Sequence, residues 1–251
     1  MGARELNYAR QRRGSPTKAA RFFMSGPLRQ GELYVVQEPG LVRQITRVLR
    51  LGAGAPLIFL DNSGYEYPAT IDAVHHGEVV CTLGKRRHNE CEPPNRVVLY
   101  QSVIKKDKME WVVEKCTELG VSSVVPVIAA RSVKQGISLE RLRTTAREAA
   151  EQSRRGKIPN IAVPMVFGAA VKHAEASGAE NVLCDAGAHP DAKEHVRMRA
   201  RNAVNLFIGP EGGFDEQEII HAVQNGFLVC GLGPRILRSE TAAVAATFLF
   251  I

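Results

Sequence analysis

The chain has 251 residues, of which 45% are apolar and 24% are charged, a composition typical of a globular protein with one large domain or two smaller ones. The longest apolar runs are too short to span a bilayer, and no secretory signal opens the chain, so we expect neither a membrane protein nor a secreted one. The formal net charge of +7 is concentrated in residues 1–30 and 131–157. That clustering suits a polyanion such as RNA, although solvated surface segments would have the same charge.

The five cysteines lie mostly among apolar residues, and no two of them have the C-x-x-C spacing of many zinc and redox sites. We therefore expect reduced and largely buried thiols in a cytoplasmic protein, with neither a structural metal nor disulfide bonds.

The first 20 residues are polar and basic and have no apolar period, so we expect a basic disordered arm. Its arginines would also fit an organelle-targeting segment, although Glu5 argues against one. Residues 21–92 alternate short β-type runs with turn residues: 32–37, 55–61, 65–74 and 78–84, with a hairpin signal at 61–66 and one short amphipathic helix over 41–51. This pattern predicts a small β-barrel.

A proline-rich joint, "NECEPPNR" at residues 89–96, separates this part from a different pattern. Buried-type strands are predicted at 96–103, 121–129, 181–187, 203–209 and 227–233, with helices at 108–120, 139–154, 215–226 and from 239 onward. Trp111 falls on the apolar side of its helix and is expected in the core. Strands that alternate with helices predict an α/β domain with a mainly parallel sheet over residues 93–251.

The most informative stretch is "NLFIGPEGGFDEQEI" at residues 205–219, where a strand runs into a glycine-rich loop. Asp215 and Glu218 have the spacing of a capping box, so a helix is expected to begin there. The loop has neither the lysine of a P-loop nor the G-x-G-x-x-G of a dinucleotide fold. It carries Glu211 instead, and a carboxylate repels phosphate but attracts a cation. S-adenosylmethionine, with its sulfonium and amino groups, fits that requirement.

A second loop of similar design follows the next strand, in "GLGPRILRSETAAVAATFLF" at residues 231–250. Ile236 and Leu237 are apolar residues beside a tight turn, a combination suited to an adenine ring. Ser239 is expected to cap the last helix. Either loop alone could be an ordinary strand-to-helix turn, but two such loops on consecutive strands favour a ligand site at the carboxyl edge of the sheet.

Taken together, "IGPEGGF" and "LGPRILRSETA" resemble the bacterial 16S ribosomal RNA (uracil-N3)-methyltransferases, the ribosomal RNA small subunit methyltransferase E family. "RFFM" at 21–24, "RVLRL" at 47–51, "KKDKMEWVVEKCTELGV" at 105–121, "RSVK" at 131–134 and "AAEQSRRGKIP" at 149–159 agree with its pattern. The resemblance covers residues 21–251 and excludes the basic arm. Ser239 stands where the family usually has threonine, and the hydroxyl is retained.

The resemblance implies a PUA-like β-barrel for RNA over residues 21–92, followed by a SPOUT-type methyltransferase domain with a trefoil knot. It also implies a homodimer, S-adenosyl-L-methionine as cofactor and 16S rRNA in the small ribosomal subunit as substrate. The cofactor would be held by three loops, with these residues: Leu183, Ile208, Gly209, Pro210, Glu211, Gly212, Gly213, Leu232, Gly233, Ile236, Leu237 and Arg238.

Methyl transfer to N3 of uracil builds negative charge on the base, which an arginine can stabilise. Arg155 and Arg238 are the catalytic candidates, although a phosphate contact for Arg155 and a structural contact for Arg238 fit equally well. The residues expected to bind RNA are Arg21, Phe22, Arg131, Arg154 and Arg155. A barrel-core position is the alternative for Phe22.

A metal site and two rival functions are weighed against this reading of the sequence. Asp185, His189, Asp191 and His195 could suggest a metal site, but their spacing matches no ligand pattern, so no metal is expected. A non-catalytic RNA-binding assembly protein would keep the basic segments without needing both glycine loops. A nucleotide-binding α/β enzyme lacks its usual motifs here.

Overall fold

A computed structural model describes residues 19–133, 136–188 and 202–251. The chain divides into two compact units, Met1–His88 and Asn89–Ile251, which are called the first and second unit below. Within the described residues, no helix is long and apolar enough to cross a membrane. His189, Asp191 and His195, named above as conceivable metal ligands, lie outside the described residues.

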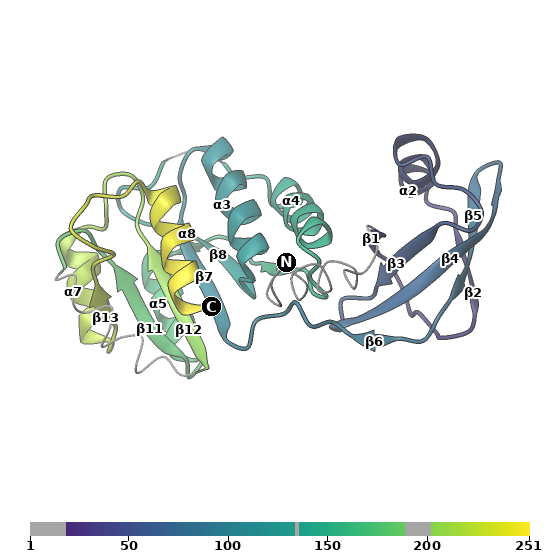
Figure 1. The fold of residues 1–251 in the computed structure, drawn as a ribbon. Helices are drawn as coiled ribbons and strands as arrows, with labels where there is room; N and C mark the ends of the chain where they lie inside the picture. The colour runs from purple at the N-terminus through teal and green to yellow at the C-terminus, as the bar shows by residue number, and fades with distance from the viewer. Residues whose placement is uncertain (1–18, 134–135, 189–201) are drawn as a thin grey trace, which may run out of the picture. The chain divides into compact units, whose positions relative to one another are not determined.

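The first unit is a mixed sheet in the order β1-β3-β4-β5-β2, with β6 paired to β4 (Figure 1). Its elements are β1 (Ala20–Phe23), β2 (Leu33–Val36), α2 (Pro39–Arg43), the π-helix η1 (Gln44–Val48), β3 (Pro56–Leu60), β4 (Tyr65–His75), β5 (Glu78–Leu83) and β6 (Arg87–His88). Only the pairing of β1 with β3 is parallel among its described strands. Phe22, Ile45, Phe59 and Ile71 lie in its core.

The predicted helix over residues 41–51 is shorter than expected and changes type at Gln44. The backbone N–H of Leu49 bonds to the carbonyl of Gln44, a five-residue step that widens the turn. Ile45 stays buried, whereas Val48 is 67% exposed. A prediction that assumes a regular α-helical period therefore puts Val48 on the buried side, whereas the wider π-helical turn exposes it.

The second unit is an α/β fold with a sheet in the order β10-β8-β7-β12-β11-β13, with β9 paired to β8, and every pairing given for it is parallel. This confirms the predicted α/β class with a parallel sheet. Its strands are β7 (Arg96–Ser102), β8 (Ser123–Ile128), β9 (Asn160–Ile161), β10 (Met165–Val166), β11 (Glu180–Cys184), β12 (Ala203–Ile208) and β13 (Leu228–Cys230).

Helices cover both faces of this sheet (Figure 1). One face packs against α3 (Lys106–Leu119), α4 (Leu139–Gln152) and α8 (Ser239–Phe250), and the other packs against α5 (Phe167–Glu175) and α7 (Glu216–Gln224). Along each strand, alternate residues enter the two cores: Leu206 faces the first helical layer and Phe207 faces the second.

The local signals for helix ends are mostly confirmed. Asp215 and Glu218 form the predicted capping box of α7, and Gly120 ends α3 in the left-handed region with φ 114°.

Two expectations for individual residues are wrong. Trp111 is 41% exposed on α3 instead of lying in the core, and Ser239 is not the N-cap of α8, because Arg238 holds that position without a side-chain cap.

Four of the five cysteines are buried and only Cys91 is exposed. The expectation that the thiols are largely buried is therefore confirmed. Across the described residues, no three His, Cys, Asp or Glu side chains gather in a group that could hold a metal.

Candidate cofactor pocket

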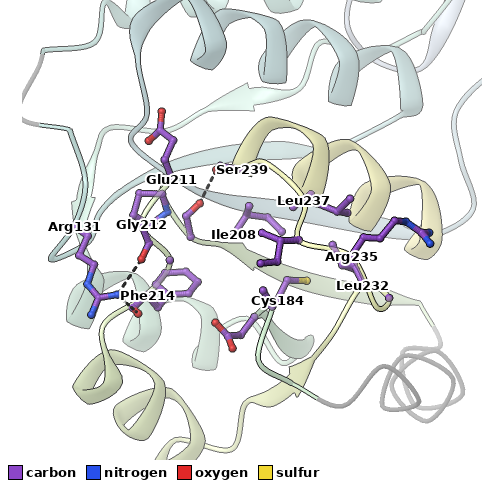
Figure 2. A pocket seen from close by; sticks show the side chains of 18 residues that line it. Arg131, Cys184, Ile208, Glu211, Gly212, Phe214, Leu232, Arg235, Leu237 and Ser239 are labelled. Atoms are coloured by element: carbon purple, nitrogen blue, oxygen red, sulfur yellow. Dashed lines mark hydrogen bonds between the residues drawn. The ribbon is translucent and has the colours of Figure 1, made fainter.

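A cavity of about 340 Å³ lies at the carboxyl ends of β11 and β12 and beside the loop that follows β13 (Figure 2). Two loops form most of its wall: the first glycine loop, residues 209–213, and the second glycine loop, residues 231–237. Parallel strands bring the ends of distant segments to one edge of the sheet, which is where α/β folds bind ligands. The lining residues are Arg131, Cys184, Asp185, Ala186, Ile208, Gly209, Pro210, Glu211, Gly212, Gly213, Phe214, Leu232, Gly233, Arg235, Ile236, Leu237, Ser239 and Ala242.

The first glycine loop turns tightly, and two of its positions disfavour a side chain, Gly209 for lack of space and Gly213 because of its positive φ. A Cβ on Gly209 would lie 3.2 Å from the backbone nitrogen of Phe214 and 3.3 Å from Gly213. Gly213 has φ +70°, in the region that glycine tolerates best, and its N–H bonds to the carbonyl of Pro210 at 2.9 Å. Phe214, only 4% exposed, anchors the end of the loop in the core. The loop thus presents backbone to the cavity.

Ser239 begins α8 directly after the second glycine loop and connects this point of the chain to the first glycine loop. Its hydroxyl donates to the carbonyl oxygen of Gly209 at 2.5 Å and accepts from the Nε2 of Gln101 at 3.0 Å (Figure 2). Gln101 is fully buried at the end of β7 and also donates to the carbonyl of Ser102 at 2.9 Å. The start of α8 is therefore fixed to both the first glycine loop and the central strand.

Arg131, which we expected to bind RNA, lies at the outer side of the first glycine loop (Figure 2). Its Nη1 donates to the carbonyl oxygens of Gly212 at 2.9 Å and Phe214 at 3.4 Å. Its Nη2 lies 3.6 Å from the carboxylate of Asp215, and half of the side chain stays exposed. In this geometry Arg131 supports the loop that lines the cavity, and its exposed part faces solvent.

The second glycine loop supplies the apolar part of the lining. Gly233 has φ +127°, a conformation that glycine adopts far more easily than other residues. Leu232, Ile236 and Leu237 line the cavity with Ile208 from β12. Ile236 is 89% exposed, so an apolar side chain is held at the rim where a ligand would cover it.

The charge of the lining is mixed. Glu211 lies 3.7 Å from the ammonium of Lys108 on α3, which also lies 3.1 Å from Glu240 on α8. Burial raises the pKa of Glu240, but hydrogen bonds from its own backbone and from Lys108 outweigh burial and hold that pKa below its ordinary value. Asp185 accepts a hydrogen bond from the N–H of Gly187 at 2.8 Å. Glu211 and Asp185 thus both line the cavity, and the carboxylate of Glu211 is directed toward Lys108 (Figure 2).

The structure brings most of the expected cofactor residues together. The cavity lining includes Ile208, Gly209, Pro210, Glu211, Gly212, Gly213, Leu232, Gly233, Ile236 and Leu237. Leu183 is fully buried, and its neighbour Cys184 lines the cavity in its place. Arg238 is not among the lining residues, whereas Arg235 is. Cys184 lines the cavity and Leu183 does not because alternate residues of β11 face opposite sides of the sheet.

Comparison with known proteins agrees with this geometry. A family described as an RNA methyltransferase domain matches residues 91–251. The ribosomal RNA small subunit methyltransferase E of Bacillus subtilis is 31% identical over 221 residues, which cover 82% of this chain and 84% of the relative. The protein of the same name from Synechocystis is 32% identical over 206 residues, covering 80% and 67%. The chain belongs to the ribosomal RNA small subunit methyltransferase E family.

Solved structures of similar proteins share the whole fold. The methyltransferase E of Neisseria gonorrhoeae, bound to S-adenosyl methionine, has a TM-score of 0.81 and 27% identity, covering 91% of this chain and 95% of that one. A methyltransferase from Legionella pneumophila, in complex with the same cofactor, has a TM-score of 0.80 and 28% identity, covering 92% and 96%.

Within this methyltransferase E fold, the position of Arg155 argues against the catalytic hypothesis for it. The side chain is 4% exposed and donates to both carboxylate oxygens of Glu92, through Nη2 at 2.9 Å and Nε at 3.3 Å. Its Nη1 donates to the carbonyls of Val121 at 2.7 Å and Thr117 at 3.2 Å. Arg155 does not line the cavity, and its donors are bonded within the protein. In this structure its guanidinium serves internal contacts of the second unit.

Two other residues expected to bind RNA are partly or fully buried. Arg21 pairs with the buried Glu66 at 2.6 Å, and its side chain is 10% exposed. Phe22 is 3% exposed and lies in the core of the first unit. The core position given above as the alternative for Phe22 is therefore the one observed. Arg154 is exposed, with φ 67°, and its carbonyl accepts a hydrogen bond from Asn89. The sequence motif located these arginines but carried no information about which of them would face solvent.

Proposed function

We propose that the protein is an S-adenosyl-L-methionine-dependent methyltransferase that methylates N3 of a specific uridine in the 16S rRNA of the small ribosomal subunit. The observation that carries the proposal is the cavity at the sheet edge, bounded by two glycine loops that Ser239 joins. Two similar structures were solved with this cofactor, and the relatives are named for ribosomal RNA methylation.

The residues that line the cavity fit the cofactor chemically. Leu232, Ile236 and Leu237 offer apolar contacts to an adenine ring, and the glycine loops offer backbone donors and acceptors to its edge. The carboxylates of Asp185 and Glu211 suit the amino and sulfonium charges. When bound, S-adenosylmethionine supplies an electrophilic methyl group.

The protein contributes position and electrostatics. Because N3 is used in base pairing, the target uracil has to be unpaired or extruded before it reaches the cavity. N3 first loses its proton to water, which leaves negative charge shared with the uracil carbonyl oxygens. The N3–C bond then forms as the bond between sulfur and the methyl group of the donor breaks, so that a neutral thioether leaves. Arg235 lines the cavity, and Arg238 sits at the N-terminus of α8 beside the lining residues Leu237 and Ser239. We propose that these two arginines stabilise that charge. Arg131 holds the first glycine loop in place.

The finer features of fold and assembly belong to the same proposal. We infer a SPOUT-type domain with a trefoil knot, because the chain leaves β12 and returns on the far side of β11 as β13. After a basic arm, residues 21–92 would form a PUA-like RNA-binding barrel that includes the described part of the first unit, and residues 93–251 would form the methyltransferase domain. Exposed Trp111 and Phe248 on α3 and α8 suit a homodimer interface. The expected compartment is the cytoplasm.

The test uses small ribosomal subunits from a strain that lacks the enzyme. With labelled S-adenosylmethionine, the purified protein should add one methyl group, and mass spectrometry should locate it on N3 of a uridine. A non-catalytic RNA-binding protein would bind the subunits without binding the cofactor in calorimetry. Methyl incorporation at another atom would refute the uracil-N3 assignment, and failure to bind the cofactor at saturating concentration would refute the whole proposal.

A further inference from the structure

The first unit ends in a run of four basic residues that no role above uses. Lys85, Arg86, Arg87 and His88 are all exposed. The last two form β6, which pairs with the beginning of β4 (Figure 1), so that Tyr65 lies opposite His88 and Glu66 opposite Arg87. Because strand side chains alternate between faces, Arg86 and His88 share the face of Tyr65, and Arg87 shares the face of Glu66.

On the first of these faces, an aromatic ring holds the basic side chains in place. The guanidinium carbon of Arg86 lies 4.7 Å from the centre of the Tyr65 ring, within the range of a cation–π contact. The His88 ring meets Tyr65 edge-on, with centroids 5.6 Å apart and planes at 88°. Arg86 is therefore positioned by a ring on one side while it remains exposed to solvent.

On the other face, a buried carboxylate positions Arg87. Glu66 is 5% exposed, and its two oxygens lie 2.5 Å from the Nε of Arg87 and 2.6 Å from Nη1 of Arg21. Burial raises the pKa of Glu66, but the hydrogen bonds and charges of Arg21 and Arg87 outweigh it, so the pKa stays below its ordinary value. The ionised Glu66 holds Arg87 at the surface, where its side chain is 48% exposed.

A hollow adjoins this segment. A cavity of about 320 Å³ is lined by Arg87 together with Gly84, Thr82, Thr70 and six further residues of the first unit. Gly84 brings the chain against β4: its N–H bonds to the carbonyl oxygen of Pro68 at 2.8 Å, and a Cβ there would lie 3.1 Å from that oxygen. Hydroxyls, apolar groups and one arginine thus surround a space of the size that small ligands occupy.

We propose that residues 85–88, together with Tyr65, form the surface of the first unit that binds an unpaired segment of the RNA substrate. Lys85 and Arg87 contact phosphates, and Arg86, backed by Tyr65, stacks on a base. Unpaired RNA fits best, because a base has to leave its helical stack to meet a guanidinium plane. Arg21 and Glu66 act as positioning residues for Arg87. The inference rests on the proposed function, since it takes the substrate to be RNA.

The test compares two double variants that remove the same charge from the first unit. Lys85→Ala with Arg86→Ala changes the proposed surface, and Arg29→Ala with Arg43→Ala removes two other exposed arginines. The measurements are the Kd for a 16S rRNA transcript at several salt concentrations, and kcat and KM for methylation of unmethylated small subunits. The first pair should raise the RNA Kd and KM about tenfold and reduce the slope of log K against log salt by about 1 to 2.

The same pair should leave the Kd for S-adenosylmethionine and kcat unchanged, and the Arg29 and Arg43 pair should bind RNA within about twofold of the parent. Equal losses in the two pairs would show that only overall charge matters and would overturn the inference. So would an unchanged RNA Kd in the first pair.

A third variant, Tyr65→Leu, separates stacking from charge. It removes the ring behind Arg86 without changing the net charge, so RNA binding should weaken about three- to tenfold with the salt slope preserved. Circular dichroism reports whether the variant folds. If it does not fold, the charge pairs still decide the question. A parent protein that binds no cofactor and transfers no methyl group would refute the proposed function, whereas a competent parent with an unaffected Lys85 and Arg86 pair would refute this inference alone.

Discussion

The hydroxyl of Ser239 donates a 2.5 Å hydrogen bond to the carbonyl oxygen of Gly209, a residue 30 positions earlier in the chain. This side chain is 6% exposed and links the start of α8, which follows the second glycine loop, to the first glycine loop. The relative position of the two loops should therefore be sensitive to the loss of this buried hydroxyl.

Replacing Ser239 with alanine should weaken cofactor binding. The change leaves the Gly209 carbonyl and the Gln101 amide without their shared partner, and a buried unpaired polar group costs about 1–3 kcal/mol. We expect the Kd for S-adenosylmethionine in calorimetry to rise about tenfold, with a lower melting temperature. Ser239→Thr keeps the hydroxyl and should bind within about threefold of the parent. Equal binding by Ser239→Ala would show that the link does not shape the cavity.

Gly209 should tolerate no side chain. In Gly209→Ala the new Cβ meets backbone atoms of Gly213 and Phe214 at 3.2–3.3 Å, and backbone cannot move aside as a flexible side chain can. We expect a loss of stability of about 1–3 kcal/mol and cofactor binding too weak to measure. Gly168→Ala, where nothing lies within 4 Å of the added atom, is the matched control and should behave like the parent. Normal binding by Gly209→Ala would contradict the close approach.

Arg155 should matter for stability and not for chemistry. Arg155→Ala removes the cation that pairs with Glu92, whose carboxylate then keeps only backbone N–H donors. It also removes a donor from the carbonyls of Thr117 and Val121, and breaking such a buried pair costs about 3–5 kcal/mol. Urea unfolding should show this loss, and a double-mutant cycle with Glu92→Gln should show strong coupling between the two residues. Assayed below its melting temperature, Arg155→Ala should keep its affinity for the cofactor. A variant of normal stability that no longer transfers methyl groups would restore the catalytic hypothesis.

Stability should fall above pH 9 because of buried thiols. Burial, and then the charge of Asp72, raises the pKa of Cys81 from 9.0 to about 11, and burial raises that of Cys116 to about 12. In the unfolded chain these thiols lose their protons near pH 9, while the folded chain keeps them. Between pH 9 and the raised pKa of each folded thiol, the unfolded state binds fewer protons than the folded state. The free energy of unfolding therefore drops by about 1.4 kcal/mol per pH unit for each thiol.

Urea midpoints measured from pH 8 to 10.5 check this dependence. Cys81→Ala should be less stable at every pH because of the cavity it leaves, but its stability should decline less steeply with pH than that of the parent. Parallel declines in the two proteins would mean that Cys81 does not contribute to the effect.

The sequence alone determined the features that depend on residues near one another in the chain. The period of apolar residues predicted the α/β class and most strands of the second unit, and the capping box at Asp215 and Glu218 predicted where α7 begins. Glycines in the two loops indicated backbone facing a ligand at the strand ends, and most residues chosen there line the cavity. These signals are local, since they reflect backbone conformation and side-chain alternation.

Tertiary structure alone decided which polar side chains are exposed and which partners they have. Arg155 and Arg21 carry the same charge as Arg131 and Arg87, yet the first two are buried against Glu92 and Glu66, while the last two keep about half of their side chains in solvent. Ser239 looked like a helix cap and instead bonds to a loop 30 residues away. Arg21 and Glu66 are 45 residues apart in the chain, and Arg155 and Glu92 are 63 residues apart. An ion pair over such a separation forms only where folding brings both charges out of water together.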